Sequence, residues 1–296
     1  SRFNVFRRGR AFTLAELLTV LAIIAVLAGL LFPVLVSVKS AALKTQCLSN
    51  MKQACEATMM YTSDYDDYFM PVNHRPGAPP NALLDRTWVQ LVLPYAKSFS
   101  IFTCPGDYGT RDDSDTIFDG DLQPGDIYAR YYTASMHVNM GYNYLYLSPI
   151  VLKPMGGIWQ WISEPRSTTA MGDQSKTILF ADTVWDRDAN GTPFDGGNWL
   201  VVPPCRYQVE DHRVADTFGE MDAPVFAPFR GWDVDNPLSG HVYGGVWPWH
   251  SGRVNLIRVD GSAKSEAISQ LSAGCEVRES WQGFVKNAAD YMWDLH

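Results

Sequence analysis

Residues 7–36 read RRGRAFTLAELLTVLAIIAVLAGLLFPVLV and contain the strongest structural signal in the chain. The twenty residues from Leu17 to Val36 carry no charge, and a single carboxylate, Glu16, directly precedes them. An apolar run of that length is sufficient for a helix to cross the hydrocarbon core of a bilayer. The stretch therefore predicts a membrane-spanning helix with an acid at its edge.

The charges on either side of the apolar run predict its orientation. Four arginines lie among the first ten residues, whereas only Lys39 and Lys44 follow the run closely, so the N-terminus is expected in the cytoplasm. A secretory signal peptide is one alternative, but its apolar region is normally shorter and ends at a small-residue cleavage site. A plain membrane anchor is another, but such an anchor has no use for Glu16.

The composition of the whole chain restricts the classes of function. The chain has 296 residues, a net charge of −8 and a pI of about 5.2. Because four of the positive charges lie in the short leader, the rest of the chain is more negative than the whole. We therefore predict no nucleic-acid partner. Only 19% of the residues are charged, while Trp, Tyr, Gly and Pro are plentiful, which indicates a loop-rich β domain outside the cytoplasm.

The cysteines bear on both disulfide and metal chemistry. No CxxC or CxxH pair is present, so the sequence does not predict a zinc knuckle. Outside the cytoplasm up to two disulfides are expected with one thiol left over, and the spacing leaves the pairing open. The five candidates are Cys47, Cys55, Cys104, Cys205 and Cys275.

The string AFTLAELLTVLAIIAVLAG resembles the N-terminus of type IV prepilins and secretion pseudopilins. The resemblance implies that a prepilin peptidase cuts between Ala11 and Phe12, that the new N-terminus is methylated, and that inner-membrane assembly machinery then polymerises the chain. It also implies that Glu16 pairs with the amino terminus of a neighbouring Phe12. Gly29 and Pro33 resemble positions that loosen the helix in filament-forming members, and proline removes an intrahelical hydrogen bond.

The residue before the expected cut departs from the family pattern. The family usually has Gly there, and this chain has Ala11. Two outcomes are open: cleavage frees the amine of Phe12 to pair with Glu16, or the leader is retained and Glu16 pairs with a leader arginine or Thr13. Either way, a carboxylate beside hydrocarbon requires a partner.

Beyond Pro33 the sequence predicts that the helix continues to about Thr62, because apolar residues recur at steps of three and four. The predicted stripe contains Val38, Ala41, Thr45, Leu48, Met51 or Lys52, Cys55, Met59 and Thr62. A neighbouring Met-rich row, which is expected to pack on the globular head, contains Cys47, Met51, Cys55 and Met59. We expect a basic leader at 1–11, a long helix at 12–62 that is first membrane anchor and then filament core, and a globular β-rich head at 63–296. The predicted fold class is α+β and pilin-like, with the helix packed on an antiparallel β-sheet head with long loops.

Within the head, short β-branched runs bounded by Gly, Pro, Asn and Asp predict strands. These runs are 141–151, 176–185, 198–203 and 253–261, and a small helix is expected at 88–96. The strings CLSNMKQACEATMMYTSDYDDYF, FTCPGD, TILFAD and HSGRVNLIRVDG resemble landmarks of a large pilin-like family abundant in planctomycete-like bacteria. That family's motif corresponds to His250, nine residues, then Asp260 and Gly261, and the family resembles the major pseudopilins of type II secretion.

The string DRDANGTPFD at 186–195 fits the first half of a calcium-binding loop, D-x-[DN]-x-[DN]-G. The expected Ca²⁺ ligands are Asp186, Asp188, Asn190, Thr192 and Asp195. Gly197 stands where an EF-hand has its Glu, so we expect a free-standing loop between strands. The resemblance to pseudopilins that bind calcium in this domain supports the ion, and a polar turn without an ion is the alternative.

His250 and Asp260 also admit a metal or acid–base interpretation, with Asp182 or Asp173 brought near by neighbouring strands. We favour a structural role, in which His250 bonds a turn and Asp260–Gly261 forms a hairpin turn. The sequence has no GxSxG, Walker, GxGxxG or HExxH motif, and we predict that the protein is not an enzyme.

The sequence as a whole predicts a structural subunit of a type IV pilus-like extracellular filament that polymerises with itself. It is expected in the inner membrane as a precursor and then in the filament. A type II secretion pseudopilin in a periplasmic pseudopilus is the nearest alternative. Rivals of other classes are a membrane-anchored module that binds glycans through aromatic loops and an anchored metallohydrolase around His250.

Overall fold

The structure is a computed structural model. It describes residues 13–74, 86–109, 134–188, 190–210, 213–216, 232, 243–278 and 283–295. The chain divides into two units, Ser1–Ala42 and Leu43–His296. The basic leader and the predicted processing residues Ala11 and Phe12 lie outside the described residues.

Helix α1 extends over 51 residues, Leu14–Asp64. It begins with a reciprocal pair of side chains. Glu16 Oε2 accepts hydrogen bonds from the Thr13 backbone N–H at 2.9 Å and from the Thr13 hydroxyl at 2.8 Å. Thr13 Oγ1 accepts in turn from the Glu16 N–H at 3.2 Å. This arrangement is a capping box, which satisfies backbone donors that the first helical turn leaves open.

The first unit consists, in its described residues, of the apolar half of α1. Its large apolar side chains are exposed, for example Leu30 (68%) and Phe32 (67%). By length and composition α1 is able to cross a membrane. The helix continues through Pro33, which has no N–H to give to the carbonyl of Gly29 one turn earlier. Gly29 and Pro33 therefore mark one missing hydrogen bond within the apolar half.

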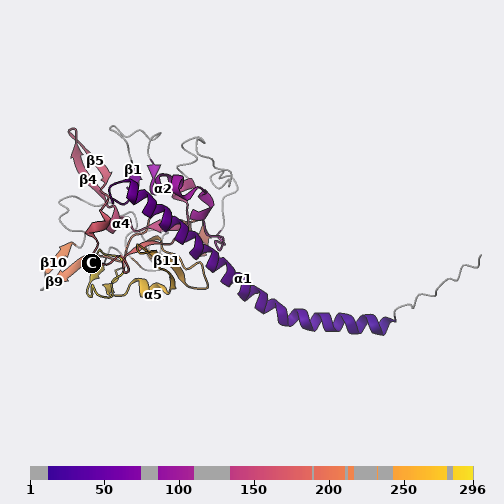
Figure 1. Cartoon of the computed structure of the whole chain (residues 1–296). Coiled ribbons are helices and arrows are strands. Elements are labelled where there is room, and N and C mark those ends of the chain that lie inside the picture. The colour runs from indigo at the N-terminus through magenta and orange to yellow at the C-terminus, as the bar shows by residue number, and fades with distance from the viewer. Residues whose placement is uncertain are drawn as a thin grey trace, which may run out of the picture. The chain divides into compact units, whose positions relative to one another are not determined.

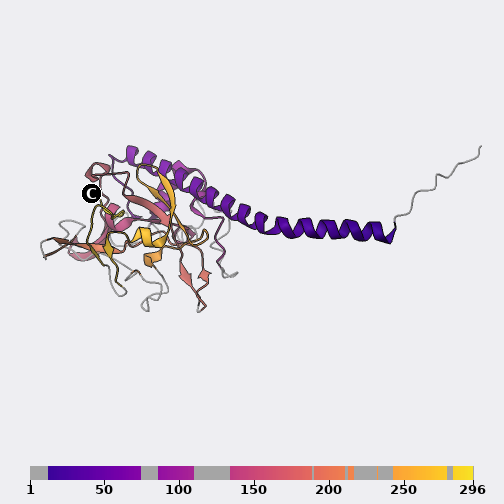
Figure 2. The same ribbon diagram turned by 90° about the horizontal axis from the view of Figure 1, so that it is seen from below.

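The second half of α1 lies along the β-rich unit in both views (Figures 1 and 2). Its buried residues are Cys47, Met51, Ala54, Cys55, Ala57, Thr58, Tyr61 and Thr62. The predicted stripe was wrong at Ala41 and Thr45, which are exposed, whereas the predicted Met-rich row is buried at Cys47, Met51 and Cys55. Two neighbouring rows of this helix are apolar, and helical spacing alone does not decide which row faces the sheet.

The central sheet of the second unit has four antiparallel strands. Its order is β12 (Ala263–Glu266), β11 (Val254–Arg258), β6 (Ile178–Asp182) and β3 (Met140–Tyr142). Every residue of β6 and β11 is buried, which means that both faces of the sheet centre are covered. The Cys55 thiol on α1 lies 3.8 Å from the carbonyl oxygen of Arg258 at the end of β11.

A second four-stranded sheet and three two-stranded ribbons complete the described strands. The second sheet has the order β10 (Arg213–Asp216), β9 (Cys205–Glu210), β14 (Gly283–Val285) and β13 (Cys275–Glu276), in which β9 and β14 run parallel. The ribbons pair β1 (Asn73–His74) with β2 (Arg86–Thr87), β4 (Ile150–Met155) with β5 (Ile158–Ser163), and β7 (Asp186–Arg187) with β8 (Pro193–Phe194).

Short helices connect these strands. They are α2 (Trp88–Ala96), α4 (Tyr144–Leu147), α5 (Ile268–Leu271) and the 3₁₀ turns η1 (Phe99–Phe102), η3 (Thr168–Ala170) and η4 (Tyr243–Gly245). A long apolar helix followed by an antiparallel β domain confirms the predicted α+β, pilin-like architecture. The expected helix at 88–96 is also confirmed.

Two predicted strands differ from the structure. The run 141–151 is divided into β3, α4 and β4. The run 198–203 forms only an isolated bridge between Leu200 and Tyr142. Local side-chain bonds replace a ladder there: Asn198 Oδ1 accepts from the Leu200 N–H at 3.1 Å, and the Thr183 hydroxyl donates to the Asn198 carbonyl at 2.8 Å.

Four of the five cysteines form disulfides, a pairing that the sequence left open. Cys47 on α1 bonds Cys104, and Cys205 on β9 bonds Cys275 on β13. Cys55 is a free, buried thiol. Each disulfide closes a long loop, which restricts the unfolded chain and so stabilises the fold.

Cys55 should resist thiol alkylation in the folded protein. Its side chain is 2% exposed, and burial, with the charges of Asp260 and Glu56, raises its pKa to about 12, so almost no thiolate is present at neutral pH. We expect mass spectrometry after iodoacetamide treatment to show labelling of Cys55 only in denaturant. Rapid labelling in native buffer would contradict this burial.

Candidate functional site

The first candidate site is the start of α1. The Glu16 side chain is exposed and bonded to Thr13 of the same chain. A carboxylate has about four lone-pair positions, so Oε1 and Oε2 retain capacity for a further donor. Exposed apolar side chains follow directly along the helix. This end of the chain thus combines an available acid with an apolar surface.

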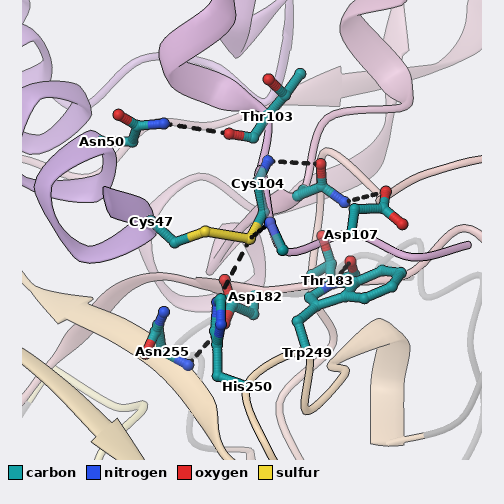
Figure 3. The surroundings of a disulfide bond; sticks show 12 residues. Cys47, Asn50, Thr103, Cys104, Asp107, Asp182, Thr183, Trp249, His250 and Asn255 are labelled. Carbon is teal, nitrogen blue, oxygen red and sulfur yellow. Dashed lines mark hydrogen bonds and ion pairs between the residues drawn. A yellow bond between two sulfur atoms is a disulfide. The ribbon is translucent and has the colours of Figure 1, made fainter. Parts of the chain in front are cut away.

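The second candidate site is a buried cluster beside the Cys47–Cys104 disulfide (Figure 3). His250 Nε2 lies 3.4 Å from Cys104 Sγ and 3.6 Å from Asp182 Oδ2. The four residues are between 1% and 7% exposed. They come from α1, the loop after η1, the end of β6 and the turn before β11, so only the folded head brings them together.

Backbone contacts hold the imidazole and carboxylate in place. Asp182 Oδ2 accepts a hydrogen bond of 2.7 Å from the Asn255 N–H on β11. The backbone of His250 forms a tight turn with Arg253, with mutual bonds of 3.2 and 3.1 Å. A Cβ on Gly106 would lie 2.8 Å from His250 Cε1, so the absence of a side chain at Gly106 makes room for the ring.

Burial controls the ionisation of this pair. It lowers the pKa of His250 to about 4, with a further contribution from the positive charge of Lys44. It raises the pKa of Asp182 well above the usual range of a carboxyl, although the hydrogen bond from Asn255 opposes the shift. At neutral pH the His250 imidazole is therefore neutral, and burial disfavours the charged form of the Asp182 carboxyl.

The other members of the predicted His-Asp-Gly motif lie in a hairpin turn. Asp260 is exposed, and its Oδ1 accepts from the Ser262 N–H at 2.8 Å. Gly261 has φ +81°, a left-handed conformation suited to glycine, in the turn from β11 to β12. Of the carboxylates considered from sequence, Asp182 lies next to His250 at 3.6 Å, whereas Asp173 is hydrogen-bonded to Ser175.

The predicted calcium residues lie in the hairpin of β7 and β8. Asp188 Oδ1 accepts from the N–H groups of Asn190 and Thr192, each at 2.8 Å, and the Thr192 bond is the main reason that the pKa of Asp188 is lowered. Asp186 Oδ1 accepts from the Arg187 N–H at 2.7 Å. Asp195 is 9% exposed with φ +55°. These bonds build a polar turn.

A third feature is the ribbon of β4 and β5. Trp159 and Trp161 are 66% and 42% exposed. They are two residues apart on β5, so both point to the same face of the ribbon. Pro154 and Leu152 stand opposite them in the register. The exposed indoles are the aromatic surface that the glycan-binding alternative requires.

A long apolar helix with an acid at its start, followed by a β-rich head, defines the pilin-like class of proteins. A family model described as the Prokaryotic N-terminal methylation motif matches residues 6–32, a range that contains Glu16 and Gly29. Neither the curated proteins nor the solved structures contain a match to this chain. The motif supports a type IV pilin- or pseudopilin-like protein and implies processing by a prepilin peptidase and a membrane-anchored precursor.

Sequence reasoning missed the proximity of the disulfide to His250. It considered Asp182 as a neighbour of His250, but it treated the cysteines only as disulfide candidates because no short metal-binding spacing is present. Cys104 and His250 are 146 residues apart in the chain. The one available signal was the pair of cysteine-containing landmarks, FTCPGD and CLSNMKQAC, in the same resemblance as the His250 motif.

Proposed function

We propose that the protein is a structural subunit of a type IV pilus-like filament that polymerises through the apolar half of α1. One observation carries the proposal: residues 14–38 form a continuous helix whose large apolar side chains are exposed, with Glu16 at its start and the methylation motif over it. Before assembly the bilayer covers these side chains, and in the filament the helices of neighbouring subunits do so.

The apolar helix and the Glu16 carboxylate have different physical roles in assembly. In a bilayer the apolar helix is already out of water, so its packing against other helices depends on shape and polar pairing more than on the hydrophobic effect. The lone Glu16 carboxylate supplies such pairing, because its charge is costly beside hydrocarbon unless a cation is near. If the leader is cut before Phe12, the amine of a neighbouring subunit is that cation, and the pairing sets the axial register.

A surface filament is the preferred form over a short periplasmic pseudopilus. The supporting observations are the missing hydrogen bond between Gly29 and Pro33, which allows local loosening of the helix, and the large acidic, aromatic head. The two forms share the N-terminal chemistry. Their difference is where the filament ends, outside the cell or within the periplasm.

Electron microscopy and N-terminal mass spectrometry test the proposal together. We expect regular filaments containing this chain, sheared from the cell surface, and a methylated Phe12 at the N-terminus. Dispersed particles only would contradict polymerisation. If the filaments contain subunits with an intact leader, the structural role still holds, and the partner of Glu16 is then a leader arginine or Thr13.

A membrane-anchored glycan-binding module is a second candidate, favoured by the exposed indoles of Trp159 and Trp161. Aromatic faces stack on the apolar faces of sugars, and here two lie on one side of a ribbon. Glycan-array binding that Trp159→Ala removes would support this candidate. Glu16→Ala should not change that binding, whereas it should abolish a filament, so the two candidates are separable.

The calcium loop remains a prediction with its own test. Calcium bound at residues 186–195 would raise the melting temperature of the head, because a ligand that binds only the folded state stabilises it. We expect a calcium chelator to lower the melting temperature of the natural chain but not of Asp188→Ala, with Asp290→Ala as an exposed control that keeps the response. No effect of the chelator on the natural chain would contradict calcium binding.

A further inference from the structure

We propose that Cys47, Cys104, His250 and Asp182 bind one zinc ion while the two cysteines are thiols, before the Cys47–Cys104 disulfide forms. The newly synthesised chain carries both cysteines in that form. The proposal does not depend on the filament function, since it concerns the folding of the head.

Two distances from His250 fit a tetrahedral site. Zinc bonds of about 2.3 Å to sulfur and about 2.0 Å to nitrogen or oxygen place any two ligand atoms about 3.3–3.8 Å apart. His250 Nε2 lies 3.4 Å from Cys104 Sγ and 3.6 Å from Asp182 Oδ2, within that range. Both sulfur atoms and a ring nitrogen of His250 lie within 4.8 Å of one another. Asp182 is not part of that group, so binding requires the two sulfur atoms to separate on reduction and the Asp182 carboxylate to move toward them.

The surroundings of Cys104 suit a thiolate. The Gly106 N–H donates to Cys104 Sγ at 3.3 Å, and a hydrogen bond to a charged acceptor is stronger than one to a neutral acceptor. The turn is closed by the Asp107 N–H, which donates to the Cys104 carbonyl at 3.0 Å. Asn139 fixes both ends: Oδ1 accepts from the Cys104 N–H at 2.8 Å and Nδ2 donates to Asp107 Oδ2 at 2.9 Å.

The contacts of Asp182 and His250 also suit a metal site. The Asn255 N–H already orients Asp182 Oδ2 at 2.7 Å, as outer partners of metal-bound carboxylates do. In the disulfide form His250 Nε2 contacts a sulfur, which is a weak acceptor, and the 3.6 Å to Asp182 is too long for an ordinary hydrogen bond. A zinc ion would give both buried groups a strong partner.

The second disulfide provides a contrast within the same chain. Cys205 lies among tyrosines: its carbonyl accepts from the hydroxyls of Tyr146 and Tyr291 at 3.0 and 2.8 Å. Among the described residues, Cys205 and Cys275 belong to no group of metal-type ligands, whereas Cys47 and Cys104 do. The histidine and carboxylate are thus specific to one of the two disulfides.

Zinc and the disulfide make the same connection by different bonds. Both join α1 at Cys47 to the loop at Cys104, and both use the same two sulfur atoms, so the chain holds one or the other. The zinc form would let α1 dock on the head before oxidation, with Cys47 already held beside Cys104.

The test uses the full chain in detergent, reduced by a phosphine without oxygen. We expect native mass spectrometry to show one zinc per reduced chain and none in the oxidised chain. Cobalt(II), added in place of zinc, should give thiolate-to-metal charge-transfer bands and tetrahedral d–d bands. A folded, reduced chain that binds no zinc, or whose cobalt spectrum is octahedral, would overturn the proposal. So would zinc bound equally to the oxidised chain.

Variants then assign the ligands, with circular dichroism as the check on folding. His250→Gln and Cys104→Ser should weaken zinc binding at least tenfold, and Asp182→Asn should weaken it by about tenfold. Cys55→Ser and Cys275→Ser are the matched controls and should bind as the natural chain does. Unchanged affinity in His250→Gln would refute the site. A reduced chain that is unfolded and that zinc does not restore would refute it as well.

Discussion

Glu16→Ala should abolish filament assembly while the chain still accumulates in the membrane. The apolar run that follows Glu16 is unaltered, so insertion is expected to persist. Loss of one partner from a buried ion pair costs about 3–5 kcal/mol, which lowers the equilibrium constant for each subunit addition more than about a hundredfold. Electron microscopy of sheared material and immunoblots of the membrane fraction measure the two quantities.

Two further variants separate charge pairing from helix capping. Glu16→Gln keeps a side-chain oxygen that can accept from the Thr13 N–H, but it has no charge. Glu56→Ala removes an exposed acid from the same helix, within the second unit. We expect Glu16→Gln to fail in assembly and Glu56→Ala to assemble normally. Normal filaments from Glu16→Gln would show that the carboxylate charge is not needed.

Trp88→Ala should lower the free energy of unfolding of the head by about 3–5 kcal/mol. Trp88 is fully buried, stacks on Phe180 with ring centroids 4.6 Å apart, and meets Phe102 edge-on at 5.6 Å. Its Nε1–H also donates to the carbonyl of Trp199, which the substitution would leave without that donor. Because domains are stable by only about 5–15 kcal/mol, this is a large fraction of the total.

Denaturant titration followed by near-ultraviolet circular dichroism measures this loss. Trp159→Ala is the matched control, because its indole is 66% exposed, and we expect a change within about 0.5 kcal/mol. A loss below about 1 kcal/mol for Trp88→Ala would mean that the aromatic group around Trp88 is not the centre of the core.

The parts of the fold that were predictable depend on neighbours in sequence. The apolar half of α1 follows from twenty uncharged residues, and its start follows from Thr13 and Glu16, three residues apart. The hairpin turn at Asp260–Gly261 was similarly predictable, because glycine readily takes the left-handed conformation that the turn has. Each of these features requires only local bonds or local composition.

The parts that were not predictable depend on contacts between distant segments. Sequence periodicity predicted two neighbouring apolar rows on α1, and only packing against the head buries Cys47, Met51 and Cys55 while it leaves Thr45 exposed. The run 198–203 has the composition of a strand, but it forms hydrogen bonds with the side chains of Asn198 and Thr183 instead of a strand ladder. Tertiary contacts override the strand propensity of a segment when they satisfy more of its polar groups than a strand ladder would.

The sequence by itself determined the long apolar helix, its edge carboxylate and the existence of a β-rich head, since each depends on composition or on spacing of a few residues. Only the tertiary structure decided which cysteines pair and that His250 and Asp182 lie beside Cys104. Those groups come from four segments: the paired cysteines are 57 positions apart in the chain, and Cys104 and His250 are 146 positions apart. Their proximity is fixed by how α1 and the strands pack into one core, which no local pattern encodes.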